Sequence, residues 1–198
     1  MNLKLEVWQR GPIEDFPVIL QPVAHALLQA REEVNDIMQD FPEDLLWKRP
    51  ADVASPGFHL QHLTGVLDRL FTYARKQRLT PVQLHSLSIE GNEEETSSSL
   101  TELVELFDKQ VELSINELKD VKSDTLTEAR TVGRKLISTT LIGLYVHAAE
   151  HTMRHLGQLL VTVKILKRLN NQCTLFTLEE SLFNSFNSLI DFFNTGCM

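Results

Sequence analysis

Three histidines, His147, His151 and His155, follow one another at intervals of four residues in the stretch "YVHAAEHTMRHLGQ". An imidazole can bind a metal ion, transfer a proton near neutral pH or form an ordinary hydrogen bond. Two histidines four residues apart on a helix share one face, so both can bind the same metal ion. The stretch therefore predicts part of a metal site, provided that two of its histidines face the protein core and another helix supplies a third ligand.

The apolar pattern around these histidines predicts a helix from about Leu136 to Arg168. The stripe of that helix consists of Ile137, Leu141, Leu144, Ala148, His151, His155, Leu159, Thr162 and Leu166. This register directs His151 and His155 into the core and leaves His147 toward the flank. Burying an imidazole is unfavourable unless its nitrogens find partners, and a metal ion is one such partner. The simplest alternative is a pair of hydrogen-bonded core histidines without a metal.

A second predicted helix offers the missing ligand. It opens at Ser55-Pro56, since a serine N-cap followed by proline in the first turn is typical of a helix start. The helix carries "FHLQH", in which His59 and His62 lie three residues apart, and each shares a face with apolar residues. Spacing alone therefore leaves the choice between His59 and His62 open. Further along the helix, Asp68 and Arg69 are expected to form a surface ion pair, and contacts to the metal ligands or to the substrate are the weaker alternative for both.

A competing interpretation starts from "HAAEH", which fits the inverted zinc-protease pattern H-x-x-E-H. In that case His147 and His151 would bind zinc, and Glu150 would be the general base. Against it, Glu150 lies about a hundred degrees around the helix from His151, because an α-helix has 3.6 residues per turn. The pattern is also short, and no other protease feature accompanies it.

The remaining sequence predicts the elements that position these residues. One helix is expected to start at Pro22 and another near Ser99, where "SLTE" fits a capping box. Residues 79–98 are polar and acidic and are expected to form a solvated loop. Four long amphipathic segments without a convincing strand pattern predict an all-α four-helix bundle over residues 1–169. Residues 170–198 have a helical apolar period and are expected to form an additional helix that packs on the bundle or on a second subunit.

Composition narrows the class of protein. The chain has 198 residues and a net charge of −8, which disfavours binding to nucleic acid or to an anionic membrane. No apolar run is long enough to span a bilayer, and the N-terminus lacks a signal-peptide pattern. The two cysteines, Cys173 and Cys197, form no CxxC pair. They are expected to be reduced thiols in a cytoplasmic protein.

The two histidine-bearing helices resemble the DinB-like (YfiT-like) superfamily of four-helix-bundle metalloproteins. The match lies in "GFHLQHLTGVLDRLFTYAR" and "HAAEHTMRHLGQLL", and with the opening segment and "LLWKRP" it covers roughly residues 5–168. The resemblance implies an up-down-down-up bundle whose metal is bound by one histidine of the second helix and two of the last. Carried onto this chain, these ligands are His62, His151 and His155.

The resemblance also implies a class of function. Members bind zinc, nickel or iron, are often dimers, and include thiol-dependent transferases and isomerases that use bacillithiol or mycothiol, besides proteins described as metal-dependent hydrolases. We therefore expect a homodimeric metal-dependent enzyme, a thiol-dependent S-transferase or a hydrolase, that acts on a small molecule, with a low-molecular-weight thiol as a candidate cosubstrate. Zinc or nickel is favoured over iron, and His147 is the candidate catalytic residue, as a proton carrier. The alternative is a non-catalytic, metal-stabilised dimeric interaction or stress-related protein.

Overall fold

The computed structural model describes the backbone of residues 4–195 and the side chains of residues 4–172. The chain divides into two units, Met1–Val163 and Lys164–Met198. The first unit contains the helix bundle and all the histidines. The boundary between the units lies within the last helix, a few residues before the boundary expected from the sequence.

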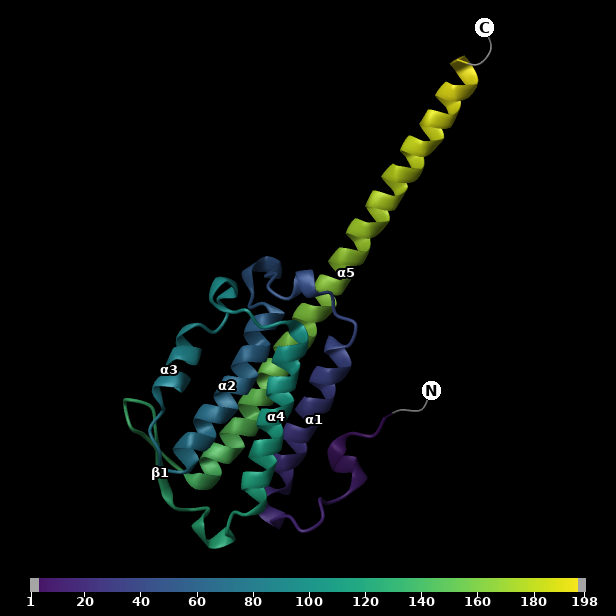
Figure 1. The fold of residues 1–198 in the computed structure, drawn as a ribbon. Helices are drawn as coiled ribbons and strands as arrows, with labels where there is room; N and C mark the ends of the chain where they lie inside the picture. Colours follow the sequence, from purple (N-terminus) through teal and green to yellow (C-terminus); the bar gives the residue numbers. More distant parts are fainter. Residues whose placement is uncertain (1–3, 196–198) are drawn as a thin grey trace. The chain divides into compact units, whose positions relative to one another are not determined.

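Four long helices build the first unit: α1 (Gln21–Met38), α2 (Pro56–Ala74), α4 (Leu100–Lys119) and the first part of α5 (Leu141–Thr195). Figure 1 shows α1 running upward, α2 and α4 downward, and the start of α5 upward again. The short helix α3 (Pro81–Ser88) lies on the return from the end of α2 to the start of α4. This arrangement confirms the predicted all-α bundle and its up-down-down-up order.

Capping residues determine where helices α2 and α4 begin. Ser55 accepts a hydrogen bond from the backbone N–H of Phe58 at the start of α2, and Pro56 occupies the first turn. At the start of α4, Ser99 and Glu102 form the predicted capping box. Each cap satisfies backbone N–H groups that have no partner within the helix. These local signals start α2 and α4 at the residues that the sequence predicted.

The helix predicted from Leu136 begins later than expected. Residues Ala129–Val132 (β1) and Ile137–Thr140 (β2) form an antiparallel hairpin instead, and α5 starts at Leu141. The expectation of a chain without strands is therefore wrong at this place. The reason is local, because "ISTT" is rich in β-branched residues, and Gly133 adopts a φ of 67° in the turn.

Two further differences concern the connections. Residues 79–98 were expected to form a loop, but Pro81–Ser88 is helical and Thr80 caps it. The backbone of α5 continues to Thr195, so the additional helix expected after Asn170 belongs to the same helix. The side chains of this extension, including Cys173, lie outside the described residues, as does Cys197. The packing of the extension thus stays a prediction.

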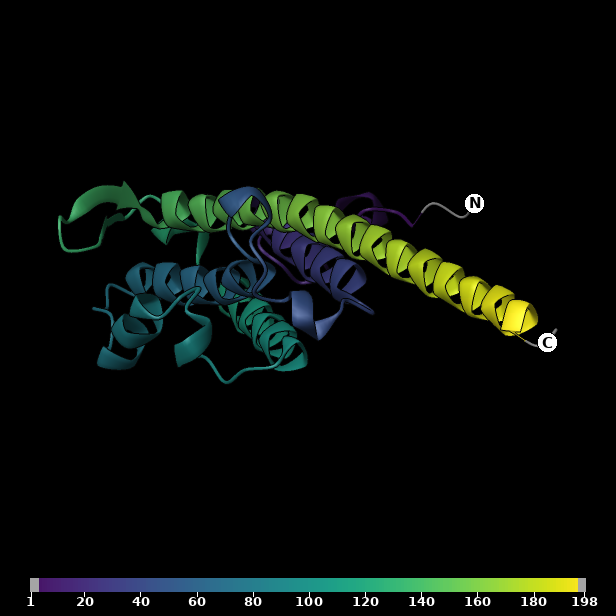
Figure 2. The same cartoon turned by 90° about the horizontal axis from the view of Figure 1, so that it is seen from above.

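Apolar side chains from all four long helices, and from the segments before α1 and α2, fill the core of the first unit. The largest of the fully buried ones are Leu20, Leu27, Leu46, Leu60, Leu63, Leu67, Phe71, Phe107, Leu118, Leu144, Leu156 and Leu159. Helix α4 packs against both α1 and α2, and the start of α5 lies beside α2 in both views (Figures 1 and 2). Among the described residues, no helix is both long and apolar enough to cross a membrane.

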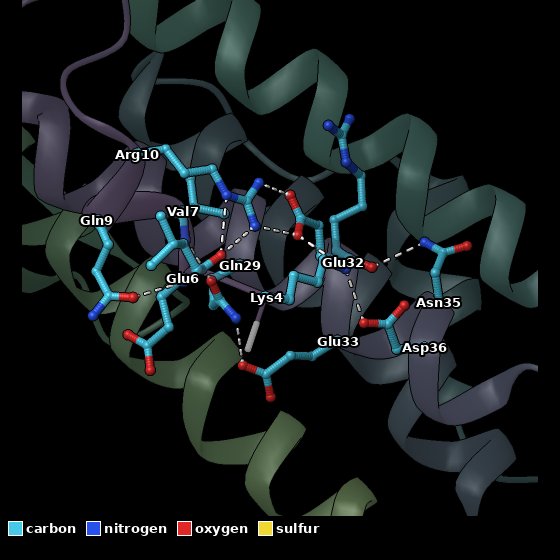
Figure 3. A network of polar contacts seen from close by, with 12 residues as sticks. Lys4, Glu6, Val7, Gln9, Arg10, Gln29, Glu32, Glu33, Asn35 and Asp36 are labelled. Atoms are coloured by element: carbon cyan, nitrogen blue, oxygen red, sulfur yellow. Dashed lines mark hydrogen bonds and ion pairs between the residues drawn. The ribbon is translucent and has the colours of Figure 1, made fainter. Parts of the chain in front are cut away.

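Ion pairs fasten the N-terminal segment to α1 (Figure 3). Arg10 forms two parallel hydrogen bonds to the carboxylate of Glu32, at 2.5 and 2.8 Å. Lys4 lies 3.2 Å from Glu32 and 3.0 Å from Asp36. The hydrogen bond from Arg10 is the main reason that the pKa of Glu32 falls from its ordinary value of 4.5 to about 2. The charged form of Glu32 is therefore favoured by folding.

This shift predicts a pH-dependent loss of stability in Glu32→Gln. Because the pKa is lowered in the folded state, the stabilising contribution is present above about pH 4.5 and fades as the pH falls toward 2. At pH 7 the variant should lose about 1 kcal/mol of unfolding free energy, since solvent screens this surface pair. Urea unfolding at pH 7 and pH 3 measures the difference, with the exposed Glu14→Gln as control. A deficit of equal size at both pH values would contradict the assignment.

Candidate metal centre

Three histidine side chains converge between α2 and α5. His62 comes from α2, while His151 and His155 lie one turn apart on α5. One ring nitrogen from each lies within 4.8 Å of those from the other two, and Nε2 of His62 is 3.0 Å from Nε2 of His151. A divalent zinc, nickel or iron ion readily accepts such a set of imidazole nitrogens. The structure thus brings together the three ligands that the family resemblance implied.

Helical register explains why α5 supplies two members of the cluster. Ala148 and Leu159, on the same stripe, are completely buried, and they hold this face of α5 against the bundle. His151 and His155 between them are half-buried. On α2, the ring of Phe58 stacks on that of His62, with ring centres 5.2 Å apart and an interplanar angle of 11°. The cluster is thus covered on the core side and accessible in part.

The surroundings keep the imidazoles of His151 and His155 neutral. Burial, followed by repulsion from the neighbouring histidines, lowers the pKa of His155 to about 4. The pKa of His151 is lowered as well, with burial as the main cause. Only an imidazole without its second proton has a lone pair for a metal. At neutral pH these two histidines therefore have the protonation state that metal binding requires.

The hydrogen bonds within the cluster also fit a metal ion. Nδ1 of His62 lies 2.7 Å from the carboxylate of Glu90. If Nδ1 donates to this carboxylate, Nε2 of His62 carries a lone pair. Its contact with His151 then requires a proton on Nε2 of His151, which leaves Nδ1 of His151 as a bare acceptor. Among the described residues that buried Nδ1 has no hydrogen-bond partner. An ion bound by Nε2 of both rings would replace the contact between them, and Nδ1 of His151 would then carry the proton and still have no partner among the described residues.

A fourth histidine, His59, lies just behind the cluster. Its ring is almost fully buried, and its Nδ1 is 3.3 Å from Nδ1 of His155. Burial is the main cause that lowers its pKa to about 4. His59 is not among the three residues whose ligand atoms converge. It therefore contacts one candidate ligand, His155, from outside the group of three.

His147 occupies the exposed edge of the same region. Half of its side chain is exposed, and its Nδ1 lies 3.5 Å from Glu150, which also pairs with Arg154. Its ring centre is 5.4 Å from that of His151, but His147 does not join the converging nitrogens. This placement disfavours the inverted protease pattern, in which His147 would be a ligand. A role for His147 as proton carrier stays a prediction.

Sequence reasoning missed Glu90 and misplaced Arg69. Glu90 follows α3, and its nearly buried carboxylate lies 2.7 Å from Nδ1 of His62 and 2.5 Å from Nη1 of Arg69. The surface ion pair expected between Asp68 and Arg69 is therefore wrong, since Arg69 is buried and pairs with Glu90. Glu90 is the first residue of the acidic run "EGNEEETSSS", and no local signal separates it from the exposed glutamates there.

A surface hollow also lies elsewhere on the first unit, between α1 and α4. Charged side chains line it, including Lys4, Asp36 and Asp108. None of the histidines contributes to this hollow, so it has no part in the cluster described above.

Comparisons with known proteins agree with this fold. The model of a family described as the DinB superfamily matches residues 26–159. A conserved protein from Enterococcus faecalis has a similar crystal structure, with a TM-score of 0.57 and 17% identity, over 74% of this chain and 96% of that one. A protein from Streptococcus pneumoniae gives a TM-score of 0.56 and 12% identity, over 82% and 97%. At such identities the likeness concerns the fold alone, and no curated protein matches.

Proposed function

Because the chain belongs to the DinB superfamily, we propose that it binds one divalent transition-metal ion through His62, His151 and His155 and acts as a metal-dependent enzyme. The observation that carries this proposal is the convergence of three imidazole nitrogens from two helices within 4.8 Å of one another. Zinc, nickel and iron all accept an all-nitrogen set, and zinc or nickel is the ion that we propose first. The ligand set alone does not choose among them.

The geometry favours a catalytic ion over a purely structural one. Structural zinc sites are closed by four protein ligands, whereas catalytic sites use three and leave a position open. Among the described residues the cluster has three members and is only half-buried. A bound ion would lower the pKa of a coordinated water or thiol and so supply a nucleophile near neutral pH.

Two side chains at the edge of the cluster have roles in this proposal. Phe58 covers one face of His62 and excludes water from that side of the ring. His147 is exposed beside His151 and can exchange protons between solvent and a bound small molecule. The proposed reactions are transfer of a low-molecular-weight thiol to a small electrophile, or hydrolysis of a small substrate, in a homodimer.

A metal-dependent activity assay tests this function. Protein stripped with a chelator and reloaded with zinc, nickel or iron(II) is offered several low-molecular-weight thiols with an electrophile, and separately a panel of esters and amides. We expect turnover with at least one metal, at roughly 100-fold or more above the stripped protein, a modest part of what metal catalysis contributes. His147→Ala should lower this turnover and leave metal content unchanged. Full metal occupancy without turnover in any arm would favour the non-catalytic alternative.

A further inference from the structure

The side of His62 that faces away from the other histidines contacts a carboxylate. Nε2 of His62 faces His151, at 3.0 Å, while Nδ1 lies 2.7 Å from Oε2 of Glu90. An ionised carboxylate only accepts hydrogen bonds, so the proton between them belongs to Nδ1. This hydrogen bond leaves the lone pair of His62 on Nε2, which is the nitrogen directed at the cluster.

Glu90 is itself held by a second partner. Nη1 of Arg69 donates to Oε1 of Glu90 at 2.5 Å, and only 9% and 8% of the two side chains are exposed. The guanidinium of Arg69 is always charged, and it lies with the ring N–H of His62 against this buried carboxylate, so the pocket compensates a negative charge on Glu90. Glu90 is therefore a fixed anion, with one oxygen on Arg69 and the other on His62.

Helix α2 leaves space for the Arg69–Glu90 ion pair at Gly65. A Cβ atom added to Gly65 would lie 2.5 Å from Nη1 of Arg69 and 2.6 Å from Oε1 of Glu90. Contacts this short require the two side chains to move. A glycine at position 65 thus lets Arg69 and Glu90 meet against the surface of α2.

The backbone around Glu90 is also fastened to α2. The N–H of Gly91 donates to the side-chain oxygen of Gln61 at 2.7 Å, and the amide of Gln61 donates to Thr96 at 2.7 Å. At the start of α3, the Gln83 amide donates to Asp68 and Thr72. Glu90 is therefore positioned by hydrogen bonds on both sides and not only by its own contact with His62.

The three candidate ligands differ in the partner of the ring nitrogen that faces away from the cluster. His155 contacts another imidazole, His59, and Nδ1 of His151 has no hydrogen-bond partner among the described residues. Within the described part of the chain, His62 is the one member of the three whose outer nitrogen contacts a carboxylate. Such a carboxylate fixes the tautomer and orientation of a ligating histidine and raises its basicity.

We propose that Glu90 is the positioning residue of the metal site: it fixes His62 as the Nδ1–H tautomer with Nε2 free for the ion, and Arg69 holds its carboxylate in place. The part that concerns metal affinity rests on the proposed function, whereas the tautomer of His62 does not.

The effect of Glu90 on the metal site is tested by measuring metal affinity. Zinc binding to purified full-length protein is followed by competition with a chromophoric chelator. Glu90→Ala should weaken the affinity by about 10- to 100-fold, as expected when an outer partner of a ligand is lost. Glu90→Gln keeps an acceptor oxygen without the charge and should fall between this variant and the wild type. The exposed Glu94→Gln removes a charge from the same segment and should stay within roughly twofold of the wild type, because solvent screens it.

The Gly65→Ala variant disturbs the Arg69–Glu90 ion pair without removing a polar group. Gly65→Ala should displace Arg69 and Glu90 and weaken zinc binding by at least about threefold, at the low end of such effects. Gly157→Ala is the matched control, since it is also helical and a Cβ there meets nothing within 4 Å. It should bind zinc as the wild type does. If Glu90→Ala fails to fold, the difference in zinc affinity between Gly65→Ala and Gly157→Ala still tests the role of Glu90.

The tautomer of His62 distinguishes positioning from a general structural effect. In metal-free, ¹⁵N-labelled protein, long-range proton–nitrogen correlations should show Nδ1 of His62 protonated, and Glu90→Ala should convert His62 to a mixture of tautomers. A wild type that binds no metal would overturn the proposed function but leave this readout intact. A wild type that binds zinc no better than Glu90→Ala and Gly65→Ala, or an unchanged tautomer in Glu90→Ala, would overturn the role of Glu90.

Discussion

Replacing His155 with alanine should reduce the metal content of the purified protein from about one ion per chain to under about a tenth of that, because a catalytic zinc site needs three protein ligands. His155 lies at the centre of the cluster, with its ring centre 4.4 Å from that of His62 and 4.6 Å from that of His151. Its removal leaves two imidazoles, which come from different helices. Elemental analysis after dialysis measures the loss, and circular dichroism verifies that the bundle remains helical.

The control for this experiment is His147→Ala. His147 lies on the same helix, eight residues earlier, but it does not belong to the converging nitrogens. Its replacement should leave the metal content unchanged within error. If His147→Ala loses as much metal as His155→Ala, the metal would instead be bound by the inverted protease pattern of His147 and His151.

The largest expected effect on stability is that of Phe107→Ala. Phe107 is completely buried in α4, the helix that packs against both α1 and α2. Truncation of a buried phenylalanine removes apolar contact and leaves a cavity, at a cost of about 3–5 kcal/mol of unfolding free energy. For a chain of this size that corresponds to a fall in Tm of roughly 6–20 °C.

Leu106→Ala is the matched control, because Leu106 is the preceding residue on α4 and 48% of it is exposed. Its replacement should change the unfolding free energy by less than about 0.5–1 kcal/mol. Thermal and urea unfolding of the metal-free variants separate the two cases. Equal losses for both variants would mean that the buried face of α4 is assigned wrongly.

Local sequence signals account for most of the fold. Capping residues such as Ser55 and Ser99 act within a single turn, so the starts of α2 and α4 follow from a few neighbouring residues. The hairpin before α5 escaped detection because Ile137 continues the apolar period of the helix and also suits a strand. The backbone pairing in the folded chain, in which Ile137 lies opposite Val132 of β1, separates the two possibilities.

Some residues of the candidate site could be predicted from the sequence and others could not. His151 and His155 follow from the register of one helix, which is a local property. The choice of His62 over His59 needed the family resemblance, because both lie on largely apolar faces of α2. Glu90 was not predictable, since its contact with His62 joins residues 28 positions apart across a connection without a recognisable pattern. Pairings of this kind are set by tertiary structure and have no periodicity to reveal them.

The arrangement of the helices also explains how the cluster of α2 and α5 histidines is assembled. The upward start of α5 returns beside α2 after α4 has run downward (Figures 1 and 2). The two ligands of α5 therefore meet His62 of α2 only when the last helix docks. Metal binding should accordingly stabilise the docked bundle, since an ion that binds only the folded state shifts the folding equilibrium toward it.

X-ray absorption spectroscopy of the zinc-loaded protein tests the three-histidine site most directly, because it reports the atoms that surround the ion. We predict one zinc ion per chain with three imidazole nitrogens at about 2.0–2.1 Å and one or two further light atoms from solvent. The imidazole signal should fall to two rings, with weaker zinc retention, in His62→Ala. A first shell that contains sulfur, or one that is the same in the wild type and in His62→Ala, would contradict the three-histidine site.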